Sequence, residues 1–94
     1  MIIKEFEVDI TPAKQKIDLG SSLPVGYSVG EVDGKLMLFV QLEEDYPGQS
    51  YIDVYSVETG QPFEKQDFFA GSVVMSTGSV VHVFTRSHYI RANI

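Results

Sequence analysis

Apolar and polar residues alternate along much of the chain, with the period of two that places successive side chains on opposite faces of a β-strand. The segment 35–43 (KLMLFVQLE) shows the pattern most clearly, because its even positions are all leucine or valine. Its odd positions include Met37 and Phe39, which are also apolar. We therefore predict a strand that is buried on most of both faces.

Turn signals between such segments predict two antiparallel hairpins. Asp33-Gly34 stands between two apolar runs, and both residues of a type I′ hairpin turn need positive φ, which this dipeptide tolerates well. The short loop 76–78 ends in glycine and separates two further runs. Each hairpin should pair its two flanking strands directly.

The complete set of predicted strands describes an all-β chain. The segments are 2–9, 15–19, 24–32, 35–43, 50–58, 68–75 and 79–87. The one helix candidate is a single turn over 11–15, where Pro12 would occupy the first helical position. Six or seven short strands with regular turns indicate a compact antiparallel sandwich or a partly open barrel. We predict one domain over residues 1–94, with 85–94 as a C-terminal extension.

Length and composition indicate the size class of this domain and the cellular compartment in which we expect it. The 94 residues suffice for one domain, and a chain this small leaves much of its surface unburied. There is no cysteine, which excludes disulfides, thiolate metal sites and a cysteine nucleophile. The first ten residues include four charges, so we expect neither a signal peptide nor a membrane span there. These observations predict a protein of a reducing cytoplasm.

Charge is distributed unevenly along the chain. The formal net charge is -6, which argues against broad binding to the DNA backbone. Residues 1–67 hold all 13 acidic residues, whereas residues 68–94 hold none and contain both arginines and both histidines. An anion would prefer the C-terminal third, although chance variation in charge between strands is an equal alternative.

The last predicted strand carries the most suggestive set of side chains. Period two places His82, Phe84 and Arg86 on one face, together with Val80 and His88. Arginine offers a planar fork to phosphate oxygens, and an aromatic ring offers a stacking surface to a base. This face is therefore a candidate nucleotide-binding surface.

Further residues of the acid-free third complete the candidate ligand site. Glycine in a strand often marks the close approach of a ligand, and a neighbouring serine hydroxyl can donate to phosphate. The full predicted set is Phe69, Gly71, Ser72, His82, Phe84, Arg86, Tyr89 and Arg91. The alternative for each residue is structural: Gly71 forms a bulge, Phe69 and Phe84 fill the core, and Arg86 points to water.

Positive signs of catalysis or of a cofactor are missing from the sequence. It contains no G-x-S-x-G elbow, Walker loop, H-E-x-x-H helix or glycine fingerprint. His82 and His88 could each pair with Asp53 or Asp67, but their spacing of six fits no common zinc pattern. We therefore expect no enzyme, no metal and no cofactor.

The order of motifs along the chain resembles a family of small uncharacterised proteins encoded by tailed bacteriophages. The matching pieces are KEFEVDI (4–10), IDL (17–19), VGYSVGEVDGKLMLFV (25–40), YSVETG (55–60), FFAGS (68–72) and VVHVF (80–84). The resemblance covers most of the chain. Phe39 stands where the family usually has tryptophan, and Glu58 where it has the first glycine of G-T-G.

The resemblance implies a phage accessory protein that acts in the cytoplasm of the infected bacterium. Small phage β proteins of this kind include anti-CBASS sponges, which bind and sequester the cyclic di- or oligonucleotides of bacterial immune signalling without cleaving them. Such a protein needs a closed, positively lined pocket with stacking rings and phosphate donors, and no catalytic group. Pockets on small chains commonly form between subunits, so we expect a homo-oligomer, as a tetramer first and a dimer second.

Three other functions remain open at this point. A phage protein that inhibits a host protein would present exposed aromatic residues such as Tyr46, Tyr51 and Tyr55. A minor virion component would be found in purified particles. An enzyme that degrades a nucleotide would return its ligand chemically altered, whereas a sponge would return it intact.

Overall fold

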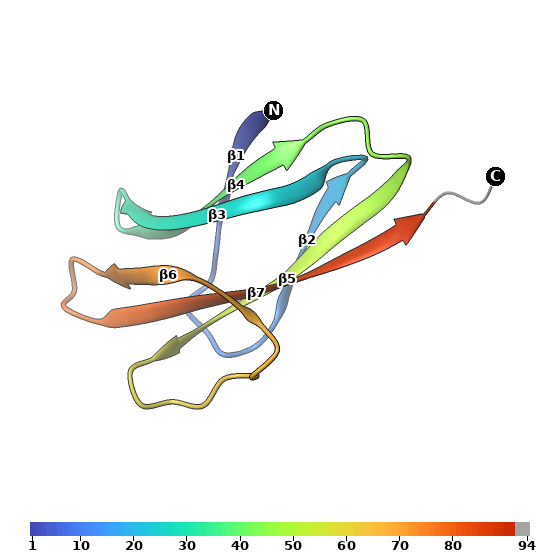
Figure 1. Cartoon of the computed structure of the whole chain (residues 1–94). Coiled ribbons are helices and arrows are strands. Elements are labelled where there is room, and N and C mark those ends of the chain that lie inside the picture. Colours follow the sequence, from blue (N-terminus) through green and yellow to red (C-terminus); the bar gives the residue numbers. More distant parts are fainter. Residues whose placement is uncertain (92–94) are drawn as a thin grey trace.

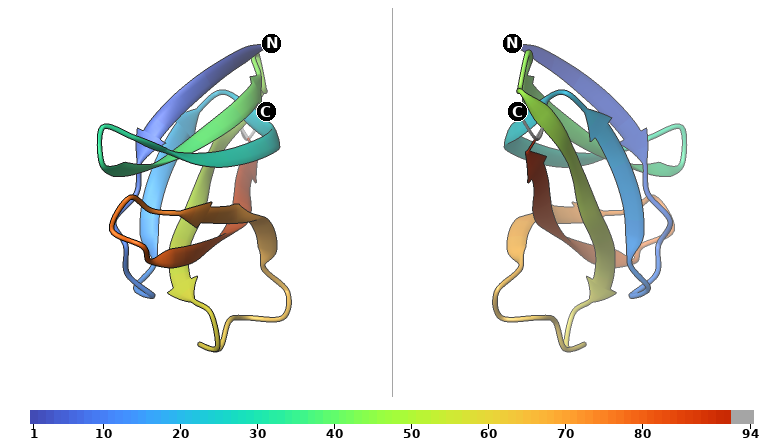
Figure 2. Two further views of the ribbon diagram at one scale, coloured as in Figure 1. Left: turned by 90° about the vertical axis from the view of Figure 1, so that its left-hand side faces the viewer. Right: turned by 90° about the vertical axis from the view of Figure 1, so that its right-hand side faces the viewer.

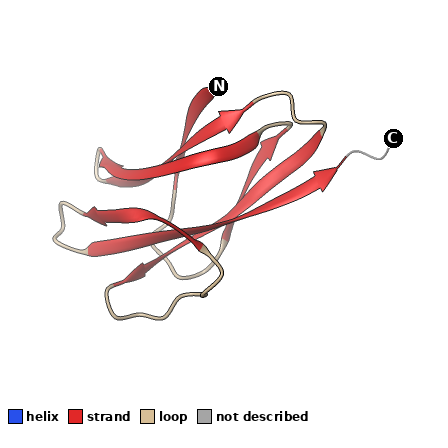
Figure 3. Cartoon of the chain, in the orientation of Figure 1, coloured by secondary structure: helices blue, strands red, loops and turns tan. Residues whose placement is uncertain are grey.

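The computed structural model describes residues 1–91, and this part of the chain contains seven β-strands and no helix (Figure 3). The strands are β1 (Ile2–Glu7), β2 (Gln15–Gly20), β3 (Leu23–Val32), β4 (Lys35–Glu43), β5 (Gly48–Glu58), β6 (Phe68–Val74) and β7 (Val80–Arg91). The predicted all-β class is confirmed. A search of residues 1–91 for a helix of the length and apolarity that a membrane crossing requires finds none.

The helical turn predicted for residues 11–15 is wrong. Residues 10–13 form a bend, and β2 begins at Gln15. Thr11 is held against β5 instead, because its amide donates to the Ser56 hydroxyl at 3.1 Å and its carbonyl accepts from the Ser56 amide at 3.0 Å. The Thr11 hydroxyl also accepts from the amide of Ala13 at 3.1 Å. These bonds satisfy the backbone of the bend without a helix.

Two antiparallel sheets pack face to face (Figures 1 and 2). One sheet has the order β1-β4-β3, and the other has the order β2-β5-β7-β6. The sheets do not close into a barrel, so the sandwich alternative describes the fold. The loop between β5 and β6, yellow in Figure 1, lies on the side of the four-stranded sheet away from the three-stranded one.

The core between the sheets explains the period-two pattern. Its buried members are Val8, Leu19, Leu36, Leu38, Val40, Leu42, Ile52, Val54, Val73, Met75, Val81 and Val83. The even positions of β4 are all inside, as the alternation predicts. Its opposite face is only half-buried at Met37 and Phe39, and Gln41 is exposed. The prediction that β4 is buried on both faces therefore holds for one face only.

Both predicted hairpins are confirmed. Asp33 and Gly34 have φ angles of 51° and 79°, the positive values that a type I′ turn needs. Gly78 in the second turn has φ of 93°, and the amide of Met75 donates to the carbonyl of Ser79 at 2.8 Å. β3 therefore pairs directly with β4, and β6 with β7.

The long strand β7 positions the candidate site. It pairs with β5 from Val81 to Arg91, but with β6 only from Val80 to Thr85. The segment 85–91 of the predicted extension is thus part of a strand, while residues 92–94 lie outside the described residues. Val81 and Val83 point into the core. Because side chains alternate, His82 and its same-parity neighbours lie on the outer face of the sheet.

Gly71 of β6 lies where β6 passes close to β3 of the other sheet. The β6–β7 register shifts between Phe69 and Gly71, which marks a β-bulge, and Gly71 has φ of 148°. A Cβ at this position would lie 2.7 Å from Cγ2 of Val29 on β3. β3 and β6 can therefore approach closely only because residue 71 has no side chain.

Candidate functional site

The outer face of the four-stranded sheet carries a second apolar cluster, separate from the main core. Tyr55, Val57 and Phe84 form it, and each is at most 5% exposed. β5 and β7 place these residues side by side, since Tyr55 pairs with Phe84 and Val57 with His82. β5 and β7 therefore carry apolar residues on both faces. One face packs in the main core, and the other forms this outer cluster.

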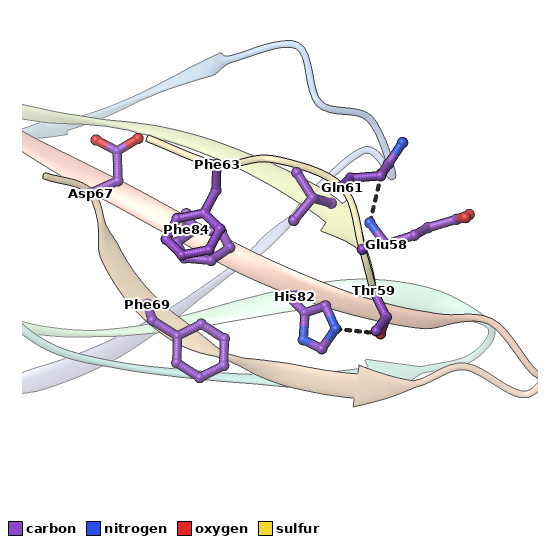
Figure 4. A pocket seen from close by; sticks show the side chains of 10 residues that line it. Glu58, Thr59, Gln61, Phe63, Asp67, Phe69, His82 and Phe84 are labelled. Carbon is purple, nitrogen blue, oxygen red and sulfur yellow. Dashed lines mark hydrogen bonds between the residues drawn. The ribbon is translucent and has the colours of Figure 1, made fainter. Parts of the chain in front are cut away.

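Aromatic rings converge on Phe84 from three directions. Tyr55 stacks on it with centroids 5.7 Å apart, and Phe63 from the β5–β6 loop stacks on it at 4.4 Å and 16°. Phe69 of β6 leans against it at 5.4 Å and 44°. Figure 4 shows Phe63 directly over Phe84, with Phe69 to one side. Phe63 and Phe69 remain about half exposed, at 56% and 53%, so their rings are accessible to a ligand.

His82 fixes the loop to the sheet beside these rings. Its Nε2 lies 2.7 Å from Oγ1 of Thr59 (Figure 4). Its Nδ1 lies 2.6 Å from Oγ of Ser72. A neutral imidazole donates through one nitrogen and accepts through the other, and the two hydroxyls can take the complementary roles. His82 thus connects β6, β7 and the loop, and no carboxylate contacts it within hydrogen-bond distance in residues 1–91.

These residues enclose a cavity of about 430 Å³ between the loop and the sheet (Figure 4). Phe63, Phe69, Phe84 and His82 supply its rings, and Thr59 supplies a hydroxyl at its loop side. Ligand pockets are typically about 300–1,000 Å³ and mostly apolar, with a few polar groups. The cavity has the size and the lining that a flat aromatic ligand would need.

A buried polar network closes the other end of the loop. The Asp67 side chain is fully buried, accepts from the Tyr55 hydroxyl at 2.6 Å and accepts from Nε of Arg86 at 2.7 Å. The Tyr55 oxygen in turn accepts from the amide of Glu64 at 3.1 Å. Arg86 was predicted to offer a free fork to phosphate, but the structure pairs it with Asp67 instead. Its buried Nη2 has no acceptor within residues 1–91, and Arg86 does not line the cavity.

The eight predicted site residues divide into three groups. Phe69, His82 and Phe84 line the cavity, and Ser72 supports it through its hydrogen bond to His82. Gly71 faces Val29 at the sheet junction, and Arg86 belongs to the buried network. Tyr89 and Arg91 lie at the far end of β7, opposite Ser50 and Gly48. The structure therefore brings the ring-bearing residues of the predicted site together and separates them from both arginines.

A histidine–carboxylate pair does exist, outside the cavity. Nε2 of His88 lies 2.8 Å from Oδ2 of Asp53, and the His88 ring stacks on Tyr51 with centroids 4.5 Å apart. Lys16 lies over the same Tyr51 ring at 4.5 Å. The partner of His88 is thus Asp53, as one of the sequence alternatives allows. Within residues 1–91, no three histidine, aspartate or glutamate side chains lie close enough together to hold a metal ion.

Thr59 and Phe63 of the loop are not in the predicted ligand set, and Asp67 was considered only as a partner for a histidine. The loop, residues 59–67, has no periodicity, so a pattern method assigns it only a turn. The one available signal is Phe63 itself, an aromatic residue that follows proline in an otherwise polar stretch. A large apolar residue in a polar loop indicates that the loop covers something.

The buried phenol of Tyr55 should make the polar network less stable at alkaline pH. Burial raises the pKa of its phenol above 10.0, and the hydrogen bond to Asp67 raises it further. A raised pKa means that the stabilisation is complete below the unfolded-state pKa and is lost as pH rises through the folded-state pKa. We expect the free energy of unfolding to fall above about pH 10.

A Tyr55→Phe variant tests this expectation by urea unfolding at successive pH values. It should lose about 1 kcal/mol at neutral pH through the missing hydrogen bond and then lose less with rising pH than the parent does. Tyr27→Phe is the comparison, because burial also raises the pKa of Tyr27, whose hydroxyl bonds Ser87 and not Asp67. It measures the part of the alkaline loss that does not come from the network. An unchanged alkaline loss in Tyr55→Phe would contradict the assignment.

Comparison with known proteins identifies a family and no function. Residues 1–92 match a family model described as a domain of unknown function (DUF7352). No curated protein and no solved structure gives a significant match. What the domain does therefore has to be inferred from the chemistry of the cavity.

Proposed function

Because the chain belongs to the DUF7352 family, a family of unknown function, we propose a function from the chain's own site: it binds and sequesters a small ligand through a nucleobase, without cleaving it. The observation that carries this proposal is the cavity of about 430 Å³ lined by Phe63, Phe69 and Phe84. Every nucleobase has a flat π-face, and stacking on an aromatic side chain stabilises binding by about 1–3 kcal/mol per base. The Thr59 hydroxyl uses one hydrogen-bonding position on His82 and keeps a lone pair that can accept from the edge of the base.

The proposed ligands are cyclic di- or oligonucleotides, and the proposed setting is the cytoplasm of a phage-infected bacterium. This part of the proposal rests on the resemblance to phage β proteins and on the ring-lined cavity. The proposed assembly is a homo-oligomer, a tetramer or a dimer, since a 94-residue chain leaves a large surface for association. The pairing of Arg86 with Asp67 means that phosphate binding needs a cation other than Arg86.

The test is a binding measurement with a matched pair of variants. Phe69 and Phe68 are adjacent and similarly exposed, at 53% and 57%, but Phe69 lines the cavity, whereas Phe68 contacts Tyr27 of β3. Phe69→Ala should weaken binding of cyclic dinucleotides by about tenfold or more, the equivalent of one lost stacking contact. Phe68→Ala should bind as the parent does. Calorimetric titration with cyclic di-AMP, cyclic di-GMP and cyclic GMP-AMP measures both.

Recovery of the ligand separates sequestration from catalysis. Heating the complex and analysing the released compound should return intact cyclic dinucleotide. A linearised or hydrolysed product would identify an enzyme. Absence of binding by all three compounds, in the parent protein, would refute the nucleotide proposal.

A host-protein inhibitor is the second candidate, and the exposed rings favour it. Tyr55, one of the residues expected to mediate such contact, is buried, and Tyr51 is stacked under His88. Phe63, Phe68 and Phe69 are the exposed aromatic residues of the β5–β6 region instead. If this candidate is correct, Phe68→Ala and Phe69→Ala should both weaken capture of the host protein.

A further inference from the structure

Phe63 separates the ring-lined cavity from a second, smaller one. The second cavity has about 240 Å³ and is lined by Pro12, Lys14, Tyr55, Val57, Pro62, Phe63 and Glu64. Val57 and Phe63 also line the first cavity. The two cavities are therefore neighbours, one on each side of Phe63.

The two walls of the second cavity are held in place. On one side, the bend that precedes Lys14 is fixed by two hydrogen bonds between Thr11 and Ser56. On the other side, the amide of Glu64 donates to the Tyr55 hydroxyl at 3.1 Å. Lys14 and Glu64 thus approach one space from separately anchored segments.

Both charged groups are available to a ligand. Lys16, Lys35 and Arg86 each lie within 4.0 Å of a carboxylate, whereas Lys14 and Glu64 form no ion pair within residues 1–91. An ammonium group attracts a phosphate, and a carboxylate accepts hydrogen bonds from sugar hydroxyls, as acidic residues do in dinucleotide-binding folds. One cation and one acceptor in a single small cavity match the two polar parts of a ribose phosphate.

We infer that the second cavity is a ribose-phosphate subsite, in which Lys14 contacts the phosphate and Glu64 accepts from the ribose hydroxyls. The inference rests on the proposed function, since it assumes that a base occupies the first cavity. Lys14 would then provide the cation for the phosphate, since Arg86 is already paired with Asp67. We also predict specificity for ribonucleotides over deoxyribonucleotides, because the deoxy sugar lacks the 2′-hydroxyl and so offers Glu64 one donor fewer.

The experiment compares nucleosides with nucleotides. The nucleoside that binds most tightly among adenosine, guanosine, cytidine and uridine is titrated alongside its 5′-monophosphate and the 2′-deoxy form of that monophosphate. Lys14→Gln should weaken the monophosphate by about tenfold, the equivalent of one charge-assisted hydrogen bond, and the nucleoside by less than about twofold. Glu64→Gln should reduce the preference for the ribo form. Lys65→Gln is the matched control, since it removes the same charge from the same region and should bind all three as the parent does.

The outcomes distinguish the subsite from the function on which it rests. If the parent binds nucleosides but Lys14→Gln leaves monophosphate affinity unchanged, the subsite is refuted and base binding stands. Equal weakening by Lys14→Gln and Lys65→Gln would also refute it, because general electrostatic attraction would then explain both. If the parent binds the cyclic dinucleotides but no monophosphate, the subsite alone is refuted. If the parent binds none of the nucleosides, monophosphates and cyclic dinucleotides, the proposed function itself fails.

Discussion

Replacing Phe84 with alanine is expected to lower the free energy of unfolding by about 3–5 kcal/mol, the usual cost of deleting a buried phenyl ring. Phe84 is 4% exposed and stacks with Tyr55 and Phe63, so its removal leaves both rings without their common partner. Small domains have total stabilities of about 5–15 kcal/mol. The substitution should therefore bring the domain close to its unfolding threshold. Equilibrium urea unfolding measures the loss.

Phe68→Ala is the control for this prediction. It removes the same ring from the strand beside Phe84, but from a position that is 57% exposed. Among the aromatic side chains of residues 1–91, Phe68 contacts only Tyr27. We expect it to cost about 1 kcal/mol or less. Equal losses in the two variants would mean that the outer cluster contributes no more than an ordinary surface contact.

The second large effect is expected from Asp67→Ala. Its carboxylate is fully buried and accepts from Tyr55 and Arg86, so alanine leaves a phenol and a guanidinium without their acceptor. Removing one member of a buried ion pair costs about 3–5 kcal/mol. The Arg86 side chain is 32% exposed, and water will compensate part of its charge, so we expect about 2–3 kcal/mol. Thermal and urea unfolding of the variant measure this loss.

A double variant separates the two causes. Asp67→Ala combined with Arg86→Met removes the charge that Asp67→Ala leaves unpaired, and it should recover part of the stability. If the double variant is no more stable than Asp67→Ala, the ion pair is not the source of the effect. Asp53→Ala is a matched control, because its carboxylate pairs with His88 at a more exposed site, outside the loop network.

The strands and hairpins could be predicted because local chemistry determines them. Asp33-Gly34 tolerates positive φ better than most dipeptides do, and the alternating residues of β4 and β5 have one face that must be buried. The same rule correctly places His82 and Phe84 on one face. Buried faces and turn types are encoded by residues that are adjacent in sequence.

The site itself depends on contacts that no period encodes. Alternation predicts which side chains share the outer face, but it cannot say what covers that face. Thr59 reaches His82 across 23 positions, and Arg86 reaches Asp67 across 19. Arg86 was assigned to phosphate because its charge is visible in the sequence, while the carboxylate that balances it lies in a loop. The helical turn at 11–15 failed for a similar reason, since the hydrogen-bond partner of Thr11 is the distant Ser56.

The two-ended anchoring of residues 59–67 has a consequence for how this family could diversify. His82 holds the loop at Thr59 and Arg86 holds it at Asp67, and both anchors are side chains on the rigid strand β7. We therefore expect substitutions between these anchors that spare Phe63 to change the mouth of the cavity while both ends of the loop stay bonded to β7. Substitutions at the few positions around Phe63 are therefore the changes by which ligand preference could evolve or be engineered.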